Sequence, residues 1–300
     1  MTPNALKEQL TGVIAFPVTP FLADGSLDVD GLRRNVQALA PHPFCGLVAA
    51  GGTGELYSLS ELEHRQVVET CAQAVADRMP VIAGVGGSVR LACDQARHAA
   101  AAGAAGILAL PPYYPDADEA GLLDYYRSIG ASTTRGLLVY SRDWVNPGPA
   151  FVERLATIPT LIAWKDGQGN VRRYQIIISS VGDRLHWIGG AGDDLVPAYY
   201  RLGIRTYTSS ISNVAPRLSI ALHETAAAGD ETALQQLMTR YVIPLYAFRA
   251  RRKGYEVAVM KAMMTLLGSA AGPVRPPLVD VSDAEREELA QMLAGWKAYL

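Results

Sequence analysis

The sequence of 300 residues lacks long hydrophobic runs, blocks of like charge and a signal-peptide pattern. No segment approaches the roughly 20 apolar residues that cross a bilayer. The opening, MTPNALKEQL, has no basic-then-apolar start. A formal net charge of only -2 argues against nucleic acid or a membrane surface as the partner. We therefore expect a soluble, cytoplasmic protein.

Metal-ligand and nucleotide-binding signatures are also missing. The three cysteines, Cys45, Cys71 and Cys93, form no C-x-x-C pair, and buried thiols in a reducing cytosol explain them best. The five histidines fall mostly in helical patterns, and none has a metal-ligand spacing. No P-loop, G-x-S-x-G elbow or flavin fingerprint occurs. The sequence therefore predicts no metal site.

What the sequence does contain is a regular alternation of short apolar runs and longer amphipathic stretches. The apolar runs lack period-two alternation, which is typical of parallel strands covered on both faces. The expected strands are residues 13–18, 46–50, 80–84, 106–110, 136–140, 161–165, 186–189 and 206–209. The expected helices are residues 28–40, 60–77, 88–102, 119–132, 149–156, 171–180, 193–202 and 215–228.

This repeated strand-then-helix order predicts a (β/α)8 TIM barrel over residues 1–230. A doubly wound sheet is the alternative, but no G-x-G-x-x-G follows the first strand. Residues 231–300 read as helices with breaks near Lys253-Gly254 and across 268–277, where prolines cannot sit inside a helix. We expect this segment to be a C-terminal helical extension packed on the barrel, so that the chain forms a single structural unit.

Lysine is scarce, and Lys165 is the only lysine between residues 8 and 252. It closes the apolar run 161–164, at the carboxyl end of an expected strand. Burial there disfavours the charged amine and prepares a nucleophile that forms a Schiff base with a ketone. A barrel lysine held in a salt bridge is the alternative from position alone.

Glycine-rich sequence follows the second expected strand, where a barrel collects its chemistry. The run Gly51-Gly52-Thr53-Gly54-Glu55 lets the backbone approach a ligand, and Thr53 adds a hydroxyl. The loop leads towards a helix whose free N–H groups favour an anion. Gly52, Thr53 and Gly54 are therefore candidates to bind a substrate carboxylate, and an ordinary turn with Glu55 in a structural ion pair is the alternative.

Further polar residues lie at other strand ends. Tyr140 ends the strand next to that of Lys165 and can relay protons, or it is a buried tyrosine with a satisfied hydroxyl. Arg142 offers a fork for a second carboxylate, or it forms a local ion pair. Ser209 supplies a hydroxyl to a ligand, or it caps the following helix. Tyr114, in a stiff proline-flanked loop, suggests packing or a subunit contact.

Together these motifs resemble the dihydrodipicolinate synthase / N-acetylneuraminate lyase superfamily. GGTGE after strand two, a tyrosine ending strand five and a lysine ending strand six occur in matching order, and the similarity runs from Phe16-Pro17-Val18-Thr19-Pro20-Phe21 to the helical tail. The resemblance implies a class I, Schiff-base-forming (β/α)8 enzyme that acts on a 2-keto acid. It needs no external cofactor, because the imine on Lys165 is the electron sink.

Within that superfamily the chain resembles the 5-dehydro-4-deoxyglucarate dehydratases. The matching features include Tyr140-Ser141-Arg142-Asp143, Lys165-Asp166-Gly167 and 272–278 in the tail. Synthases usually carry GTTGE, whose first threonine is Gly52 in this chain. They also usually carry an arginine five residues after the tyrosine, where this chain has Val145. The Pro112-Tyr113-Tyr114 loop and Gly192-Asp193-Asp194 look more like the synthase or lyase.

The resemblance implies a role for each candidate. Lys165 is the Schiff-base lysine, Tyr140 the proton relay, and Gly52, Thr53 and Gly54 hold the carboxylate beside the ketone. Arg142 and Ser209 are candidates for the distal carboxylate or hydroxyls, and Tyr114 reaches into a neighbouring subunit of a homodimer or homotetramer. We expect Trp144 to narrow the pocket mouth.

The activity so implied is dehydration and decarboxylation of 5-dehydro-4-deoxy-D-glucarate. A class I aldolase with the same lysine and a catalytically silent sugar-acid-binding paralogue are the alternatives.

Overall fold

Eight parallel strands close into a barrel in the order β1-β2-β3-β4-β5-β6-β7-β8. The computed structural model describes residues 1–114 and 116–300. The strands are β1 (Gly12–Ala15), β2 (Gly46–Ala49), β3 (Val81–Val85), β4 (Gly106–Ala109), β5 (Gly136–Ser141), β6 (Leu161–Asp166), β7 (His186–Gly189) and β8 (Thr206–Ser209). The predicted barrel is confirmed, with strand ends within three residues of those expected, and the doubly wound alternative is wrong.

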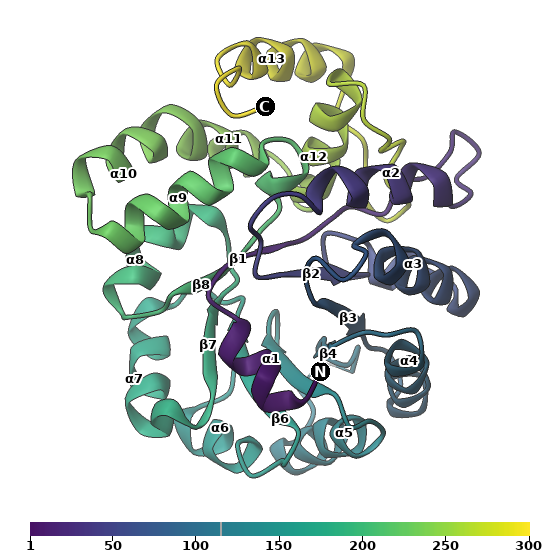
Figure 1. Cartoon of the computed structure of the whole chain (residues 1–300), viewed down its shortest axis with the longest axis vertical. Helices are drawn as coiled ribbons and strands as arrows, with labels where there is room; N and C mark the ends of the chain where they lie inside the picture. The colour runs from purple at the N-terminus through teal and green to yellow at the C-terminus, as the bar shows by residue number, and fades with distance from the viewer. Residues whose placement is uncertain (115) are drawn as a thin grey trace.

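Helices follow each strand and cover the outside of the barrel (Figure 1). They are α2 (Val29–Leu39), α3 (Glu61–Ala74), α4 (Val89–Ala101), α5 (Glu119–Ala131), α6 (Pro149–Leu155), α7 (Val171–Val181), α8 (Val196–Arg201) and α9 (Pro216–Ala228). The stretch expected to be one helix over 193–202 is divided, because a 3-10 turn, Asp193–Leu195, precedes α8. The other predicted helices are present with ends that differ by up to three residues.

An additional helix, α1 (Pro3–Gln9), was missed by the sequence reasoning. Thr2 caps it and Pro3 occupies its first turn, both ordinary signals for a helix start. Leu6 and Leu10 are fully buried, and α1 packs against β5 and β6 at the amino ends of the strands. Figure 1 shows this helix in front of the strands. It therefore covers the end of the barrel opposite the candidate site.

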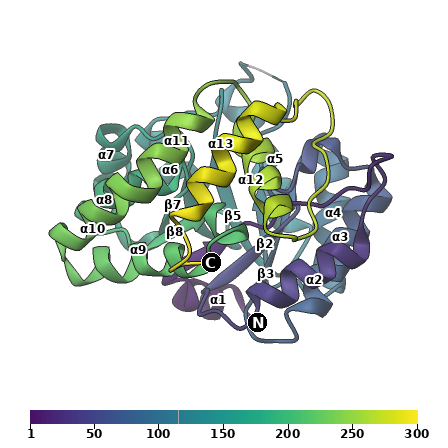
Figure 2. The same cartoon turned by 90° about the horizontal axis from the view of Figure 1, so that it is seen from above.

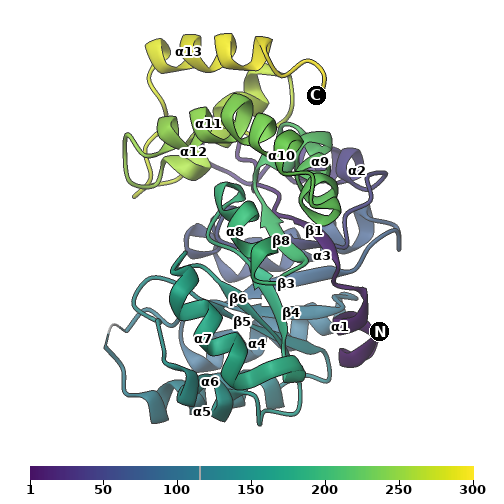
Figure 3. The same ribbon diagram turned by 90° about the vertical axis from the view of Figure 1, so that its left-hand side faces the viewer.

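The tail consists of four helices, α10 (Glu231–Leu237), α11 (Ile243–Arg249), α12 (Tyr255–Leu266) and α13 (Asp283–Ala294). A π-helical segment, Met238–Val242, joins α10 to α11. Both predicted breaks are present, since Gly254 at φ 83° separates α11 from α12 and no helix covers 268–280. Figures 2 and 3 show α13 on the outer side of α12.

The tail is tied to the barrel by the half-buried Arg275 and by a buried ion pair. Arg275 donates to the carbonyls of Gly25 and Ser58 and forms an ion pair with Glu63. Lys261 on α12 forms an ion pair with Glu55, in the loop after β2. These contacts place α12 beside the carboxyl ends of the strands.

Candidate active site

Lys165 lies near the carboxyl end of β6 and points into a cavity at that edge of the barrel. Only 2% of the residue is exposed. Its amine donates to the Gly190 carbonyl at 3.0 Å and lies 3.3 Å from the centre of the Tyr140 ring. No ion pair involves this amine within the described part of the chain. The salt-bridge alternative for Lys165 therefore finds no support.

The surroundings of Lys165 favour a neutral amine. Burial lowers the pKa of Lys165 well below its ordinary value, and the positive charge of Arg142 lowers it further, against an opposing effect of Asp166. A free amine is the form that attacks a carbonyl carbon. These surroundings are suited to a nucleophile that needs no separate base to remove its proton first.

Tyr140 faces the same space from the neighbouring strand. It is paired in register with Lys165 across β5 and β6. Its hydroxyl donates to the Gly190 carbonyl at 3.4 Å, so the phenol and the amine converge on one acceptor. Burial raises the pKa of Tyr140 above its ordinary value, which keeps the phenol protonated. A Cβ at residue 190 would overlap the Lys165 amine, so only glycine fits there.

The loop after β2 presents free backbone donors beside this pair. The N–H groups of residues 52–54 make no hydrogen bond to any part of the protein that the structure describes, and the Thr53 side chain lines the cavity. Buried N–H groups require a partner. The arrangement is therefore suited to a carboxylate. Gly52 and Thr53 line the cavity, whereas Gly54 does not, and the Gly54 carbonyl accepts from the Thr19 hydroxyl at 2.7 Å.

Arg142 lies against this same loop. Its Nη1 is 2.5 Å from the position that a Cβ of residue 52 would occupy. Its Nε pairs with Asp143 at 3.3 Å, and its guanidinium lies 6.0 Å from the centre of the Tyr140 ring. Arg142 therefore lies beside the proposed carboxylate seat, whereas the sequence reasoning assigns it to the distal end of the substrate.

Glu55, which ends the GGTGE motif, forms a structural ion pair. It is fully buried and pairs with Lys261 at 2.6 Å, and its other oxygen accepts from the Arg275 backbone at 3.0 Å. Burial lowers the pKa of Lys261, and Glu55 partly opposes that effect. The ion pair anchors the end of the glycine-rich loop to α12.

The structure differs from the expectation at Ser209. Successive residues of a strand point to opposite sides, and the neighbours Thr208 and Ser210 line the cavity whereas Ser209 does not. The Ser209 hydroxyl bonds to Asp193 and Ser219 and is fully buried. Its position gives no contact with a substrate in the cavity. The alternation along the strand was the sequence signal that distinguishes these three residues.

Of two expectations for the loops after β4 and β5, the subunit contact of Tyr114 stays a prediction, and the role of Trp144 is corrected. Tyr114 is 73% exposed and does not line the cavity of its own chain. Trp144 does not narrow the mouth, because it is half-buried and its indole N–H donates to the Pro112 carbonyl at 3.1 Å. Trp144 thus joins the loops after β4 and β5.

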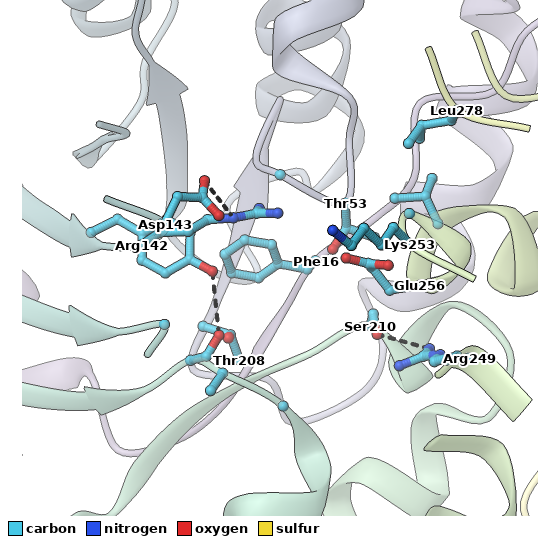
Figure 4. A pocket seen from close by; sticks show the side chains of 18 of the residues that line it. Phe16, Thr53, Arg142, Asp143, Thr208, Ser210, Arg249, Lys253, Glu256 and Leu278 are labelled. Atoms are coloured by element: carbon cyan, nitrogen blue, oxygen red, sulfur yellow. Dashed lines mark hydrogen bonds and ion pairs between the residues drawn. The ribbon is translucent and has the colours of Figure 1, made fainter. Parts of the chain in front are cut away.

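The cavity has a volume of about 770 Å³, and the tail supplies a large part of its wall (Figure 4). The tail residues that line it include Tyr246, Arg249, Lys253 and Glu256. Sequence reasoning missed all of them, because nothing in a helical tail indicates which side chains will face a barrel mouth. The polar residue Asp193 also lines the cavity, and burial raises its pKa to about 6.

Metal-ligating clusters are not a feature of this site. Within residues 1–114 and 116–300, no group of three histidine, cysteine or carboxylate side chains is placed to hold a metal ion. No helix in the same residues is long and apolar enough to cross a membrane.

The fold and the site are those of a (β/α)8-barrel lyase. The sequence model of the Dihydrodipicolinate synthetase family matches residues 9–295, and the chain belongs to this family. A protein of Rhodococcus opacus named "Probable 5-dehydro-4-deoxyglucarate dehydratase" is 38% identical over 296 residues, 97% of each chain. A protein of the same name from Saccharopolyspora erythraea is 37% identical over 300 residues, 99% of this chain and 97% of its own.

Solved structures agree with the assignment. The crystal structure of dihydrodipicolinate synthase from Oceanobacillus iheyensis has a TM-score of 0.93 at 27% identity and covers 99% of both chains. The synthase from Bacillus clausii has a TM-score of 0.92 at 26% identity, covering 97% of this chain and 99% of its own. The predicted family resemblance is confirmed.

Proposed function

We propose that the protein is a Schiff-base-forming lyase that converts 5-dehydro-4-deoxy-D-glucarate to 2,5-dioxopentanoate, carbon dioxide and water. The desolvated amine of Lys165, which forms no ion pair with the described residues, is the observation that carries this proposal. The names of the relatives from Rhodococcus opacus and Saccharopolyspora erythraea support the substrate. The presence of Gly52 and Val145, where synthases usually carry threonine and arginine, argues against the synthase reaction.

The reaction begins with imine formation. The carboxylate beside the ketone binds the free N–H groups of the loop after β2 and the Thr53 hydroxyl. The Lys165 amine then attacks the ketone carbon. The Tyr140 phenol donates a proton to the carbinolamine oxygen, which leaves as water and gives the iminium. The Gly190 carbonyl holds both groups at the start of this step.

The iminium then drives elimination and decarboxylation. It acidifies the adjacent methylene, and loss of a proton there gives an enamine that expels the neighbouring hydroxyl as water. The conjugated iminium accepts the electron pair of the far carbon–carboxylate bond, and carbon dioxide leaves. Protonation at carbon and hydrolysis of the imine, which consumes the water released when it formed, return Lys165 and give the product. The net change is one substrate dianion and one proton to one product monoanion, one carbon dioxide and one water.

The imine supplies the electron sink, so the proposal needs no external cofactor. We also propose that residues 1–230 and 231–300 fold as one unit, because both segments line the cavity. A homodimer or homotetramer in the cytoplasm completes the proposal, and the exposed Tyr113 and Tyr114 are suited to a subunit contact.

Incubation with pyruvate and sodium borohydride tests the covalent step. We expect a reduced adduct on Lys165, no adduct in Lys165→Ala, and an adduct in Lys253→Met, whose lysine lines the same cavity. Absence of the adduct in the unmodified protein would support a silent binding protein.

Release of carbon dioxide from 5-dehydro-4-deoxyglucarate tests the second half of the reaction, and release of pyruvate in place of carbon dioxide would indicate an aldolase.

A further inference from the structure

Arg249, at the carboxyl end of α11, is a buried cation with few partners. It is 6% exposed, and one of its terminal nitrogens donates to the Ser210 hydroxyl at 3.0 Å. Its Nε is buried and has no hydrogen-bond partner within the described residues. A guanidinium carries five N–H donors, and burying its charge is costly unless an anion or several acceptors compensate it.

Two acidic side chains, Asp193 and Asp194, lie near Arg249, but neither forms an ion pair with it. Each oxygen of the Asp193 carboxylate accepts from another group, one from the Ser209 hydroxyl and the other from the Tyr246 hydroxyl at 3.0 Å. Arg249 forms no ion pair with any carboxylate of residues 1–114 and 116–300. The interior of the protein therefore leaves part of the hydrogen-bonding capacity of Arg249 unused.

Arg249 and Ser210 line the same cavity as Lys165. Figure 4 shows them together on one side of Phe16 and Thr53, with Arg142 on the other side. The cavity thus has one arginine beside the proposed seat of the first carboxylate and another at a separate place. Arg252 and Lys253 also line the cavity, but both are exposed and can stay hydrated without a ligand.

We propose that Arg249 and Ser210 form a subsite for the far carboxylate of a dicarboxylic 2-keto acid, an inference that rests on the proposed function for the identity of the ligand. Arg142 then acts at the first carboxylate. The far carboxylate accepts hydrogen bonds from the N–H groups of Arg249 that donate to no protein group. The Ser210 hydroxyl holds the guanidinium in place. This subsite selects a keto acid that is charged at both ends over one that ends in a hydroxymethyl group.

The subsite contributes to binding more than to the rate. The far carboxylate loses its charge as carbon dioxide departs, so a guanidinium that holds it stabilises the bound substrate more than the transition state. Loss of Arg249 is therefore expected to raise KM, and to leave kcat within about threefold of its original value.

Binding measured without turnover tests the subsite independently of the chemistry. In the Lys165→Ala background, calorimetric titration compares 5-dehydro-4-deoxyglucarate with the analogue that carries a hydroxymethyl group in place of the far carboxylate. We expect the diacid to bind about 10- to 100-fold more tightly, as for one charge-assisted contact. Adding Arg249→Met should remove that preference and leave binding of the analogue unchanged.

Matched variants separate this role from a structural one. Arg251→Gln removes an arginine that pairs with Glu288 on the surface, and it should keep the full preference. Arg249→Lys should keep part of it, and Ser210→Ala should reduce it even if Arg249→Met does not fold. An unchanged preference in Arg249→Met, or its loss in Lys253→Met instead, would overturn the subsite. Failure of the proposed function is recognised separately, by the absence of a pyruvate adduct in the unmodified protein.

Discussion

The guanidinium of Arg142 occupies the space that a side chain at residue 52 would need, with Nη1 2.5 Å from that position. The two departures from the synthase pattern are therefore linked. Synthases usually carry a threonine at the position of Gly52 and their arginine three residues after Arg142, at the position of Val145. Here Val145 is buried in the core, and the absence of a side chain at Gly52 admits an arginine from a different place.

We expect Gly52→Thr to displace Arg142 and weaken binding of the keto acid. Loss of one charge-assisted contact costs about 1.5–3 kcal/mol, which corresponds to a KM increase of roughly 10- to 150-fold. Steady-state kinetics measure the change. In the double variant Gly52→Thr/Arg142→Ala the threonine has room, so KM should be no higher than in Arg142→Ala alone. An additive loss in the double variant would show that the clash is not the cause.

The pH dependence of adduct formation should respond to Arg142. The rate rises with pH as Lys165 loses its proton, and it becomes constant above the pKa of that amine. Burial and Arg142 lower this pKa, so the plateau should begin well below the ordinary lysine value of about 10.4. Removing the cation in Arg142→Gln raises the Lys165 pKa, and the profile should move to higher pH.

Borohydride trapping with saturating pyruvate between about pH 6 and 10 measures this profile. Arg154→Gln removes an exposed arginine outside the cavity, which pairs with Glu119, and should leave the midpoint unchanged. Equal midpoints in the unmodified protein and Arg142→Gln would exclude the effect of Arg142 on Lys165.

Tyr140→Phe should slow imine formation without removing the packing of the ring. A positioned acid or base contributes about 10²- to 10⁴-fold, and adduct formation with pyruvate should fall by that amount. Trapping the adduct with borohydride at successive times gives the rate of imine formation. Tyr57→Phe serves as the control, because Tyr57 lines the same cavity but does not share the Gly190 acceptor with Lys165. Similar losses in both variants would argue against a specific proton relay by Tyr140.

The Glu55–Lys261 ion pair should be critical for stability. Lys261→Met leaves the fully buried Glu55 carboxylate without its cation, and breaking such a pair costs about 3–5 kcal/mol in the free energy of unfolding. Urea unfolding measures this free energy. The exposed pair of Arg251 and Glu288 is the comparison, because its loss should cost at most about 1 kcal/mol.

A double variant, Glu55→Gln/Lys261→Met, checks the reason for that loss. It removes both charges, so it should be more stable than Lys261→Met alone. If the double variant loses as much stability as the two single changes together, the cost does not arise from an unpaired buried charge.

The sequence identified Lys165 and Tyr140 as neighbours because a parallel barrel leaves little freedom in their placement. Each closes an apolar run, and consecutive strands of a barrel lie side by side with their carboxyl ends at one edge. The register that pairs the two residues follows from the strand ends. The glycine-rich loop after β2 was found by the same reasoning, since its position in the chain determines its edge of the barrel.

Ser209 and Arg249 show where that reasoning stops. Ser209 was chosen by its place at a strand end, but the alternation of side chains turns it towards α9 and turns Thr208 and Ser210 into the cavity. Arg249 lies 84 residues after Lys165, in a helix whose pattern contains no indication of a binding site. Its placement depends on how the tail packs against the barrel.

By itself, then, the sequence determined the barrel and the places of the candidate nucleophile, its neighbouring phenol and the glycine-rich loop, because local apolar patterns and chain order specify strands and their ends. Only the tertiary structure decided that Arg142 fills the place of a missing side chain at Gly52, that Glu55 is paired by Lys261, and that Arg249 reaches the cavity. Those relationships join segments far apart in the chain, and they depend on side-chain volume and on charges buried when the tail packs. No periodic pattern in the sequence predicts these relationships.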